Sequence, residues 1–389
     1  MYGDNPEYAL LALVLARRLA TLGDRHPLLI LPTPDVPAPF LHALRRAGCQ
    51  VLSPTGYLWM HPQLLRAPKG RHSPVLTKLR ALGLVGLKKL LLLDLDILPR
   101  RGLDALFEFR APAAKMMPAH LQHALPLASG DIVPNTWLEV CAQTGTAGRI
   151  NAGVCLLEPD PELLEYIARE VDPARELFEA DGADAICDVF GALWRPSWTP
   201  EEDALTRGLR ALYPEVCWTH LGVAWNYEVQ GDLGYYPGLP LAEEHSRLDL
   251  KKDVCVFHFS GSQKPSWYAW HIGRGEMSIE EVCREAAEVK ADEDPRGTVH
   301  AATREWLEAF GELHTHARCV WGIDVLELVG WAAPSLATWP GGPAPGEACQ
   351  GPRAPEELPG SPDGQQRDRS RSRGEAYLAS AGDVAPDSE

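Results

Sequence analysis

The amino-acid sequence predicts an α/β fold in which helices and strands alternate along the chain. Helix start and stop signals recur, the first being Asn5-Pro6, with Gly23 as the stop. Asn before a helical Pro is a typical N-cap, and Gly is a typical helix end. Short apolar runs at 28–31 and 50–52 separate the helices. This alternation is typical of a sheet whose strands are joined by crossover connections.

The stretch 88–100, KKLLLLDLDILPR, is the best-defined strand, and it carries Asp94 and Asp96 at its end. A short apolar run bounded by turns predicts a strand that is buried on both faces. Because side chains alternate along a strand, the two carboxylates lie on the same side. They repel each other unless a cation lies between them. The pair therefore indicates a divalent metal at the carboxyl edge of the sheet, where α/β proteins bind ligands.

Two other interpretations of Asp94-Leu95-Asp96 stay open on spacing alone. In the first, the carboxylates only end the strand and cap the turn before the next helix. In the second, they belong to the phosphatase signature of the haloacid dehalogenases, whose first Asp is a nucleophile. That signature usually has Thr or Val two residues further on, whereas Ile97 and Leu98 follow here.

The remaining elements follow from the same local signals. Further strands are predicted at 115–117, 150–157 and 254–259. Further helices are predicted at 38–47, 73–84, from Leu103 onward, at 161–170, after the capping box 199–202, and at 301–313. The first helix has the apolar spacing of an amphipathic helix. From about Pro340 the chain is rich in Gly, Pro, Ser, Asp and Arg, which predicts disorder.

Composition excludes several classes of partner. The 389 residues carry a net charge of −16, so we expect no nucleic acid and no anionic membrane surface as a partner. The nine cysteines are scattered without a CxxC pair, which predicts neither a zinc site nor a disulfide framework and favours a reducing, cytoplasmic location. No run of about 18 apolar residues predicts a membrane span.

Several short motifs then occur in a fixed order. They are Tyr8, 31–36, 77–79, 93–96 with 104–107, 150–154, 202–203, 225–226, and 257–265 with Trp267. This series, over about residues 4–267, resembles glycosyltransferase family 8, the glycogenin-like retaining hexosyltransferases. The haloacid dehalogenase interpretation falls away because it leaves the later motifs unexplained.

The resemblance implies a fold of the GT-A type, with a single mixed sheet flanked by helices. Residues 1–271 would form the glycosyltransferase domain, 272–338 a short helical extension and 339–389 a disordered tail. The implied activity is metal-dependent, retaining transfer of a hexose from a UDP-sugar to an unknown glycan, polyol or protein acceptor. The alternative is a non-catalytic relative that serves as a binding or scaffold protein.

The same resemblance implies the site residues. The metal, Mn²⁺ or Mg²⁺, would be held by Asp94, Asp96 and His258, two hard carboxylates and an imidazole that suit such an ion. Lys264, Asp203 and Lys78 would take part in catalysis. The donor would be bound by Tyr8, Asn151, Ala152, Gly153, Gly261 and Lys264. In this scheme Gly261 lets the backbone approach the diphosphate, and Gly153 leaves room for the sugar.

Two features depart from the family pattern. The family begins with a strand that would precede Met1, so we expect the sheet to lack its first strand and to leave neighbouring edges unpaired. We therefore predict further N-terminal residues of strand character, and with such an extension the Golgi lumen becomes the alternative location. The family's Gln after Asp203 is Ala204 here, which changes the contacts to sugar or acceptor.

Overall fold

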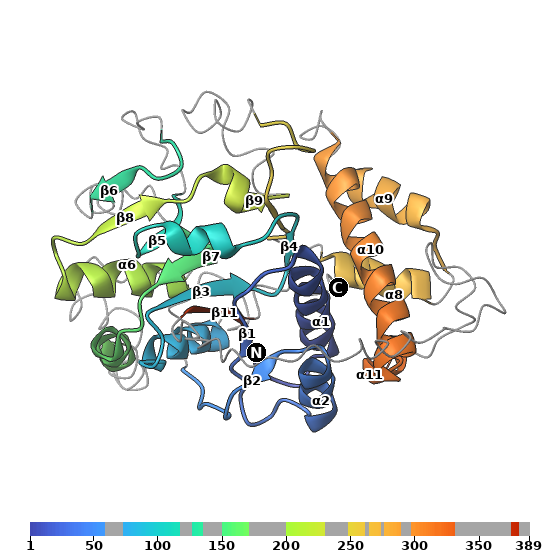
Figure 1. The fold of residues 1–389 in the computed structure, drawn as a ribbon, viewed down its shortest axis with the longest axis horizontal. Helices are drawn as coiled ribbons and strands as arrows, with labels where there is room; N and C mark the ends of the chain where they lie inside the picture. Colours follow the sequence, from blue (N-terminus) through green and yellow to red (C-terminus); the bar gives the residue numbers. More distant parts are fainter. Residues whose placement is uncertain are drawn as a thin grey trace, which may run out of the picture.

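The structure is a computed structural model with a central mixed sheet and helices on both of its faces (Figure 1). It describes residues 1–58, 73–116, 127–134, 150–170, 200–229, 248–260, 264–273, 276–288, 297–330 and 375–380. Within these ranges the arrangement confirms the predicted α/β class.

Two sheets are formed by the described strands. The main sheet has the strand order β2-β1-β11-β3-β7-β5-β8-β6, and a smaller sheet has the order β4-β10-β9. The strands are β1 Leu28–Ile30, β2 Gln50–Val51, β3 Lys89–Asp94, β4 Ile97–Pro99, β5 Ala113–Met116, β6 Ile132–Pro134, β7 Ile150–Leu157, β8 Cys217–His220, β9 Tyr227–Glu228, β10 Val256–His258 and β11 Glu375–Ser380. The main sheet is mixed, because β3 runs parallel to β11 and antiparallel to β7.

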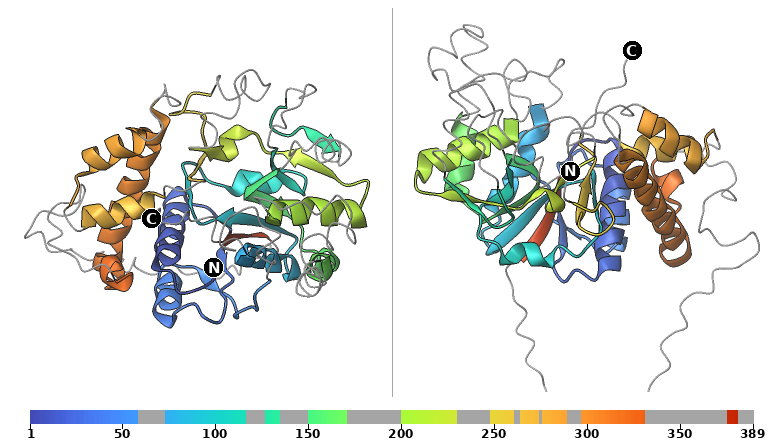
Figure 2. Two further views of the ribbon diagram at one scale, coloured as in Figure 1. Left: turned by 180° about the vertical axis from the view of Figure 1, so that it is seen from behind. Right: turned by 90° about the horizontal axis from the view of Figure 1, so that it is seen from above.

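Helices cover both faces of the main sheet, as the edge-on view in Figure 2 shows. The helical segments are α1 Pro6–Leu22, α2 Ala38–Arg46, η3 Ser73–Gly83, η4 Asp104–Glu108, residues 161–170, α6 Pro200–Leu212, η6 Val223–Trp225, α8 Pro265–Gly273, α9 Ile279–Glu288, α10 Thr298–His316, η7 Ala317–Trp321 and α11 Val325–Leu328. The predicted helix at 73–84 is present as a 3₁₀ helix, and the β4 strand was not predicted.

The β3 strand is buried on both faces, as predicted, because its leucines alternate between two cores. Leu91 and Leu93 belong to the core that contains α1, the small sheet and α8 to α11. Leu90 and Leu92 belong to the core that contains η3, residues 161–170 and α6. The alternation follows from the period of two along a strand. The helices within the predicted extension 272–338 share the first core, so they are not packed separately from residues 1–271.

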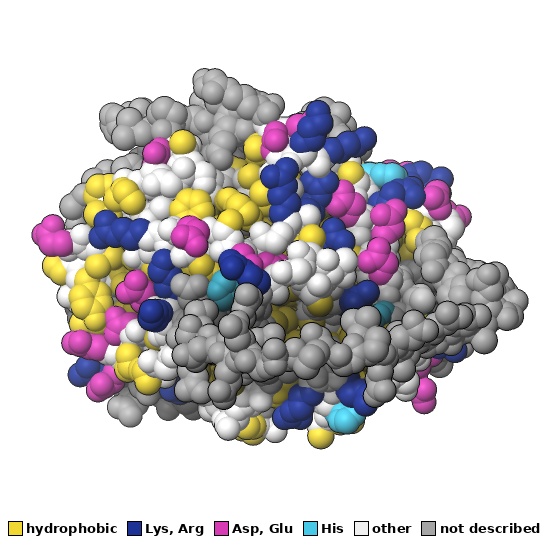
Figure 3. Space-filling model, viewed as in Figure 1, with side chains coloured by type: hydrophobic (Ala, Val, Ile, Leu, Met, Phe, Trp, Pro, Cys, Tyr) yellow, Lys and Arg dark blue, Asp and Glu magenta, His cyan; other side chains and the backbone are white. Residues whose placement is uncertain are grey.

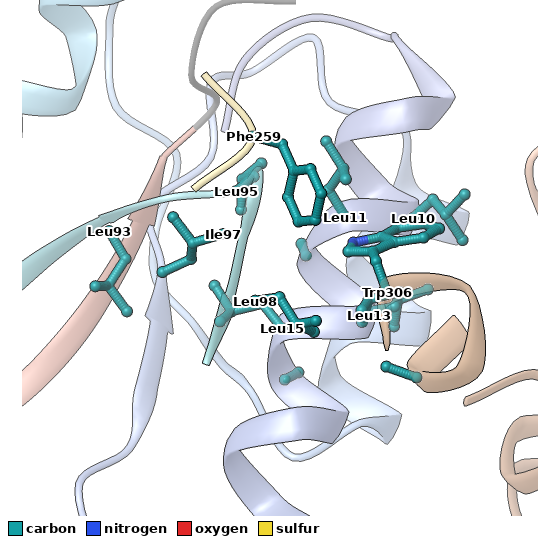
Figure 4. Close-up of a cluster of buried hydrophobic side chains, with 14 of the residues drawn as sticks. Leu10, Leu11, Leu13, Leu15, Leu93, Leu95, Ile97, Leu98, Phe259 and Trp306 are labelled. Atoms are coloured by element: carbon teal, nitrogen blue, oxygen red, sulfur yellow. The ribbon is translucent and has the colours of Figure 1, made fainter. Parts of the chain in front are cut away.

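The α1 helix departs from the amphipathic prediction, because residues 8–16 are all buried. Its caps agree with the sequence: Asn5 Oδ1 accepts from the Glu7 amide at 3.0 Å, and Gly23 ends the helix at φ 76°. The other face is covered by α10, and Figure 4 shows Trp306 of α10 beside Leu10 and Leu13. A helix that is apolar all round needs partners on both sides.

The expected missing strand is the main correction to the predicted fold. The position between β1 and β3 is occupied by β11, which pairs in parallel with both strands. The prediction that these strands have unpaired edges is therefore wrong. Within the predicted disordered tail over 339–389, residues 375–380 form the strand β11, and the rest of that range lies outside the described residues.

Two further predictions concern the cysteines and the membrane. Five cysteines of the described ranges are free thiols, namely Cys49, Cys155, Cys217, Cys255 and Cys283. Cys319 is disulfide-bonded, whereas the sequence predicted no disulfide framework. Across the described residues, none of the helices combines the length and the apolar character that crossing a bilayer requires.

Candidate functional site

Asp94, Asp96 and His258 are brought together by the junction of the two sheets. Asp94 is the last residue of β3, and the chain turns directly into β4. β4 pairs antiparallel with β10, so that Ile97 lies opposite His258, and the Phe259 amide donates to the Asp96 carbonyl at 2.9 Å. One ligand atom from each of the three buried residues lies within 4.8 Å of the other two.

Each of the two carboxylates contacts a different buried lysine through one of its oxygens. Lys78 Nζ lies 3.0 Å from Asp94 Oδ1, and Lys264 Nζ pairs with Asp96 Oδ2. The other two oxygens face the imidazole: His258 Nε2 lies 3.8 Å from Asp94 Oδ2 and 3.5 Å from Asp96 Oδ1. Each carboxylate therefore gives one oxygen to a lysine and turns the other toward a shared point.

The three converging atoms fit a hard divalent cation. Asp96 Oδ1 is buried and has no hydrogen-bond partner among the described residues. His258 Nε2 lies 3.8 Å from one of the two oxygens and 3.5 Å from the other, which is short enough for a single ion to contact the imidazole and either carboxylate. A cation at this point would satisfy the buried oxygen and would offset the repulsion between Asp94 and Asp96.

The neighbouring charges in the site favour the charged forms of Asp96 and His258. Burial would raise the pKa of the Asp96 carboxyl, but the charges of Lys264 and His258 outweigh it and hold that pKa well below its usual range. Burial would lower the pKa of the His258 imidazole, but Asp96 and Asp94 raise it above its ordinary value. Without a metal, these carboxylates therefore favour the protonated imidazole, and metal binding at Nε2 competes with a proton.

An asparagine pair orients His258. Nδ1 of His258 lies 2.9 Å from Asn226 Oδ1, and the Asn226 side-chain amide donates to Asn151 Oδ1 at 2.7 Å. Since an amide oxygen accepts, Nδ1 carries a proton and Nε2 is the atom left for a metal. Asn226 is fully buried. It appeared in the sequence only as part of a family motif, without an assigned role.

Gly153, which was predicted to leave room for a sugar, lies against His258. A Cβ at this position would lie 2.3 Å from His258 Cε1 and 2.6 Å from Nδ1. The imidazole therefore packs directly on the β7 backbone. The glycine leaves the space that this imidazole fills, and Asn151 Oδ1 accepts from the Gly153 amide at 2.9 Å. The contact to a sugar stays a prediction.

Two glutamates join the site, and sequence reasoning assigned neither of them a role. Glu201 Oε1 lies 3.0 Å from Lys78 Nζ, and Glu202 Oε1 accepts from the Ala152 amide at 3.0 Å. Both are buried in the first turn of α6. Burial would lower the pKa of Lys78, but Asp94 and Glu201 raise it, so this lysine stays charged.

Asp203, the predicted catalytic carboxylate, is half-buried on α6. Its backbone carbonyl accepts hydrogen bonds from two side chains of the same helix, Thr206 Oγ1 at 3.3 Å and Arg207 Nε at 3.2 Å. The helix therefore presents Glu201 and Glu202 to Lys78 and β7. A run of three acidic residues in one first turn was the available signal, and it does not say which of them points inward.

Tyr8, the predicted base-stacking aromatic, lies in an aromatic cluster near the carboxyl end of β1. Its ring packs edge-on against Tyr2 at 5.3 Å, and Tyr2 lies 6.4 Å from the ring of Tyr57. The Tyr57 hydroxyl donates to Asp35 Oδ2 at 2.6 Å. Tyr8 is largely buried, whereas Tyr2 and Tyr57 are half-buried. The cluster thus offers both aromatic faces and a carboxylate.

Lys264 ends the loop after β10, and the helix α8 begins at the next residue. The lysine is almost fully buried, and besides Asp96 it donates to the Phe259 carbonyl at 2.7 Å. Pro265 and Trp267, which belong to the last motif of the series, lie in the first turn of α8. Gly261, the predicted diphosphate contact, lies outside the described residues.

A second buried ion pair adjoins the histidine. Lys115 Nζ lies 2.6 Å from Glu228 Oε2, and both side chains are buried. Burial would raise the pKa of the Glu228 carboxyl, but Lys115 and His258 lower it. The pair was not predicted, and it extends the charged network from the metal ligands to β5 and β9.

A separate polar cavity of about 530 Å³ lies away from these residues, between α10 and the loop at 249–254. Basic side chains gather above the middle of the face in Figure 3, close to acidic ones. The cavity is lined by Arg18, Arg100, Arg101, Lys251, Lys252, Val254, Glu305, Glu308, Ala309 and Glu312. Arg100 donates to the carbonyls of Leu250 and Val254 at 2.5 and 3.0 Å and pairs with Glu305. The arginine thus joins a loop to α10.

Comparison with known proteins gives one relative in sequence. No family model matches the chain. It is 27% identical over 281 residues to the uncharacterized protein R707 of Acanthamoeba polyphaga mimivirus, and the match covers 72% of this chain and 84% of that protein.

Comparison with solved structures gives several glycosyltransferases. The chain is similar to the galactosyltransferase LgtC in complex with donor and acceptor sugar analogues, at 17% identity and a TM-score of 0.45, over 81% of this chain and 95% of that one. It is also similar to mouse xyloside xylosyltransferase 1, at 17% identity and a TM-score of 0.35, over 67% of this chain and 96% of that one. At these values, the side chains around Asp94 and Asp96 tell more about function than the overall likeness does.

Proposed function

We propose that the protein is a metal-dependent glycosyltransferase of the GT-A type that transfers a hexose from a UDP-sugar, with retention, to an acceptor hydroxyl. One observation carries the proposal: Asp94 Oδ2, Asp96 Oδ1 and His258 Nε2 converge on a buried point, with a lysine on the outer oxygen of each carboxylate. Two oxygens and one imidazole suit Mn²⁺ or Mg²⁺. When bound there, such an ion would neutralise the donor diphosphate and stabilise the departing UDP.

The lysines have complementary tasks in this proposal. Lys264 is held against Asp96, and its remaining donor capacity would face the phosphate whose charge grows as the sugar leaves. Lys78 is clamped between Asp94 and Glu201, so that it fixes the direction of the Asp94 carboxylate. Because both lysines are buried, their charges act at low dielectric and are screened little.

The transfer step needs no nucleophile from the protein. The bond between the anomeric carbon and the phosphate oxygen breaks, and the acceptor oxygen bonds to the same carbon on the same face. The acceptor proton passes to the departing phosphate oxygen, so the step balances. Asn151, Ala152, Glu201 and Glu202 would position the sugar, and Asp203 stays a prediction for the same role.

The proposal is tested by UDP release across several UDP-sugars, with and without Mn²⁺, for the unsubstituted chain and for Asp96→Asn. We expect Mn²⁺-dependent release in the first and a loss of at least about 100-fold in the variant, because one ligand charge is removed. Asp249→Asn, at an exposed turn, is the matched control and should retain activity. Mn²⁺ and UDP binding in Asp96→Asn equal to that of the unsubstituted chain would refute the metal assignment, and binding without turnover would favour the scaffold alternative.

A further inference from the structure

The main sheet contains a strand from a distant part of the chain. The other described strands of this sheet lie between residues 28 and 220, whereas β11 begins at Glu375. β11 pairs with β3 along its whole length, from Glu375 opposite Lys89 to Ser380 opposite Asp94. On its other side it pairs with Leu28–Ile30 of β1. The last residue of β11 therefore lies beside a predicted metal ligand.

Without β11 the sheet would divide into two parts. In the strand order, β11 alone separates β1 from β3, so its removal leaves β2-β1 on one side and the strands from β3 to β6 on the other. β1 and β2 have only three and two residues, too few to be stable as a pair. In the intact sheet the residues of β1, and those of β3 apart from Lys89, are buried, so removal of β11 would expose apolar side chains and leave the backbone groups that it pairs without their partners.

The first residues of the chain contact the same edge of β1 that β11 pairs with. The last pair of β1 and β11 is Ile30 with Ala379, and the next contact along this edge is the Met1 amino group, which donates to the Leu31 carbonyl at 3.0 Å. The Thr33 amide donates in turn to the Met1 carbonyl at 3.0 Å. β11 and the first residues thus follow one another along a single edge, which leads to the aromatic cluster of Tyr2, Tyr8 and Tyr57.

We propose that the slot between β1 and β3 is a strand-binding surface whose occupant is residues 375–380 of the same chain. By inserting there, β11 joins the part of the sheet that carries the aromatic cluster to the part that ends in Asp94 and Asp96. The match in length supports this occupant, because all six residues of β11 are paired with the six residues of β3. Recognition of this kind depends on backbone hydrogen bonds along an open edge.

The intervening chain permits insertion within one molecule. Residues 331–374 separate the last described helical region from β11, and 44 residues could span about 145 Å if fully extended. The entropic cost of closing such a loop grows only slowly with its length. The effect of β11 on donor binding rests on the proposed function, whereas strand insertion itself does not.

The first test is amide hydrogen exchange on the full chain without ligand. We expect the amides of 375–380 to be protected to within about tenfold of those in β3, since strands of one cooperative unit open together. Exchange of 375–380 at the rate of an unstructured peptide would overturn the proposal.

The second test compares a chain that stops after residue 370 with a control that stops after residue 382 and so keeps β11. The shorter chain should melt at a lower temperature and lose protection in β1 and β2, and a peptide of residues 371–383 should restore both saturably. Equal melting and equal protection in the two truncated chains would refute the insertion. A melting temperature that rises with protein concentration would place β11 in a second copy and overturn the same-chain assignment.

UDP binding is measured separately on the full chain. If β11 is protected and UDP does not bind, the proposed function fails while the insertion stands. If the shorter chain does not fold, the exchange measurement on the full chain decides the matter by itself.

Discussion

Substitution of Gly153 by Ala probes the site through a single methyl group. The added Cβ would lie 2.3 Å from His258 Cε1, whereas ordinary contacts are at least 3.4 Å, so the ring must move by about 1.1 Å. β7 is paired with β3 from Val154 onward and with β5 at Asn151 and Cys155, so that the residues on both sides of Gly153 are held, while Gly153 itself lies where the β5 register shifts. We expect the imidazole, at the end of a side chain, to move away from β7.

That displacement is large for a metal ligand, since metal–ligand distances hold to about ±0.2 Å. We expect Gly153→Ala to weaken Mn²⁺ binding by at least the 10–100-fold that is typical of disturbed ligand support. Overpacking should also lower the free energy of unfolding by about 1–3 kcal/mol. Calorimetric titration with Mn²⁺ and a thermal melt measure the two effects.

Two further variants make the test specific. Gly86→Ala is the matched control, because a Cβ there meets nothing within 4 Å, and it should change neither quantity. In a His258→Ala background the clash disappears, so Gly153→Ala should then cost little, with a coupling of about 0.5–3 kcal/mol between the two positions. Unchanged Mn²⁺ affinity and melting in the single variant would show that the ring does not pack on Gly153 as described.

Two other predictions follow from the charges. Lys264→Ala should lower kcat more than it weakens donor binding, because the lysine stabilises negative charge that grows in the transition state. The control Lys88→Ala, at an exposed lysine, should change neither kcat nor KM. A change in KM alone would mean that Lys264 binds the ground state and the transition state equally well. The raised pKa of His258 in the metal-free protein means that its stabilising contribution is complete below about pH 6.5 and is lost as pH rises through the folded pKa. Mn²⁺ should therefore bind more tightly as pH rises and should release protons on binding, which calorimetry in buffers of different ionisation enthalpy measures. Binding without release of protons would contradict the assignment.

Several features could be predicted from local sequence because local chemistry decides them. The caps of α1 depend on Asn5 and Gly23 alone, and the structure shows both. The burial of β3 on both faces followed from an uninterrupted run of leucines. Asp94 and Asp96 were expected to share a side, and one oxygen of each does converge with His258, although Asp96 lies in the turn after β3 and not in the strand.

Other features depended on how distant elements pack. Three acidic residues begin α6, and successive helical residues point about 100° apart, so the packing of α6 on β7 decides that Glu201 and Glu202 face the site. That His258 packs on Gly153 could not be predicted from the sequence, because the β4–β10 pairing places this histidine there. The amphipathic prediction for α1 failed because the sequence of one helix does not show that a second helix, α10, covers its other face.

The sequence by itself determined the α/β class, the buried β3 strand and the residue types of a hard-metal site, because these depend on side-chain period, local capping and ligand chemistry. Only the tertiary structure decided which strand lies beside β3. The short run Ala376–Ala379 is apolar like other strands, but its composition does not specify a partner more than 280 residues away in the chain. The partner is decided by the backbone N–H and C=O groups along the edges of β1 and β3, which are in position to pair with β11 only once the rest of the sheet has formed.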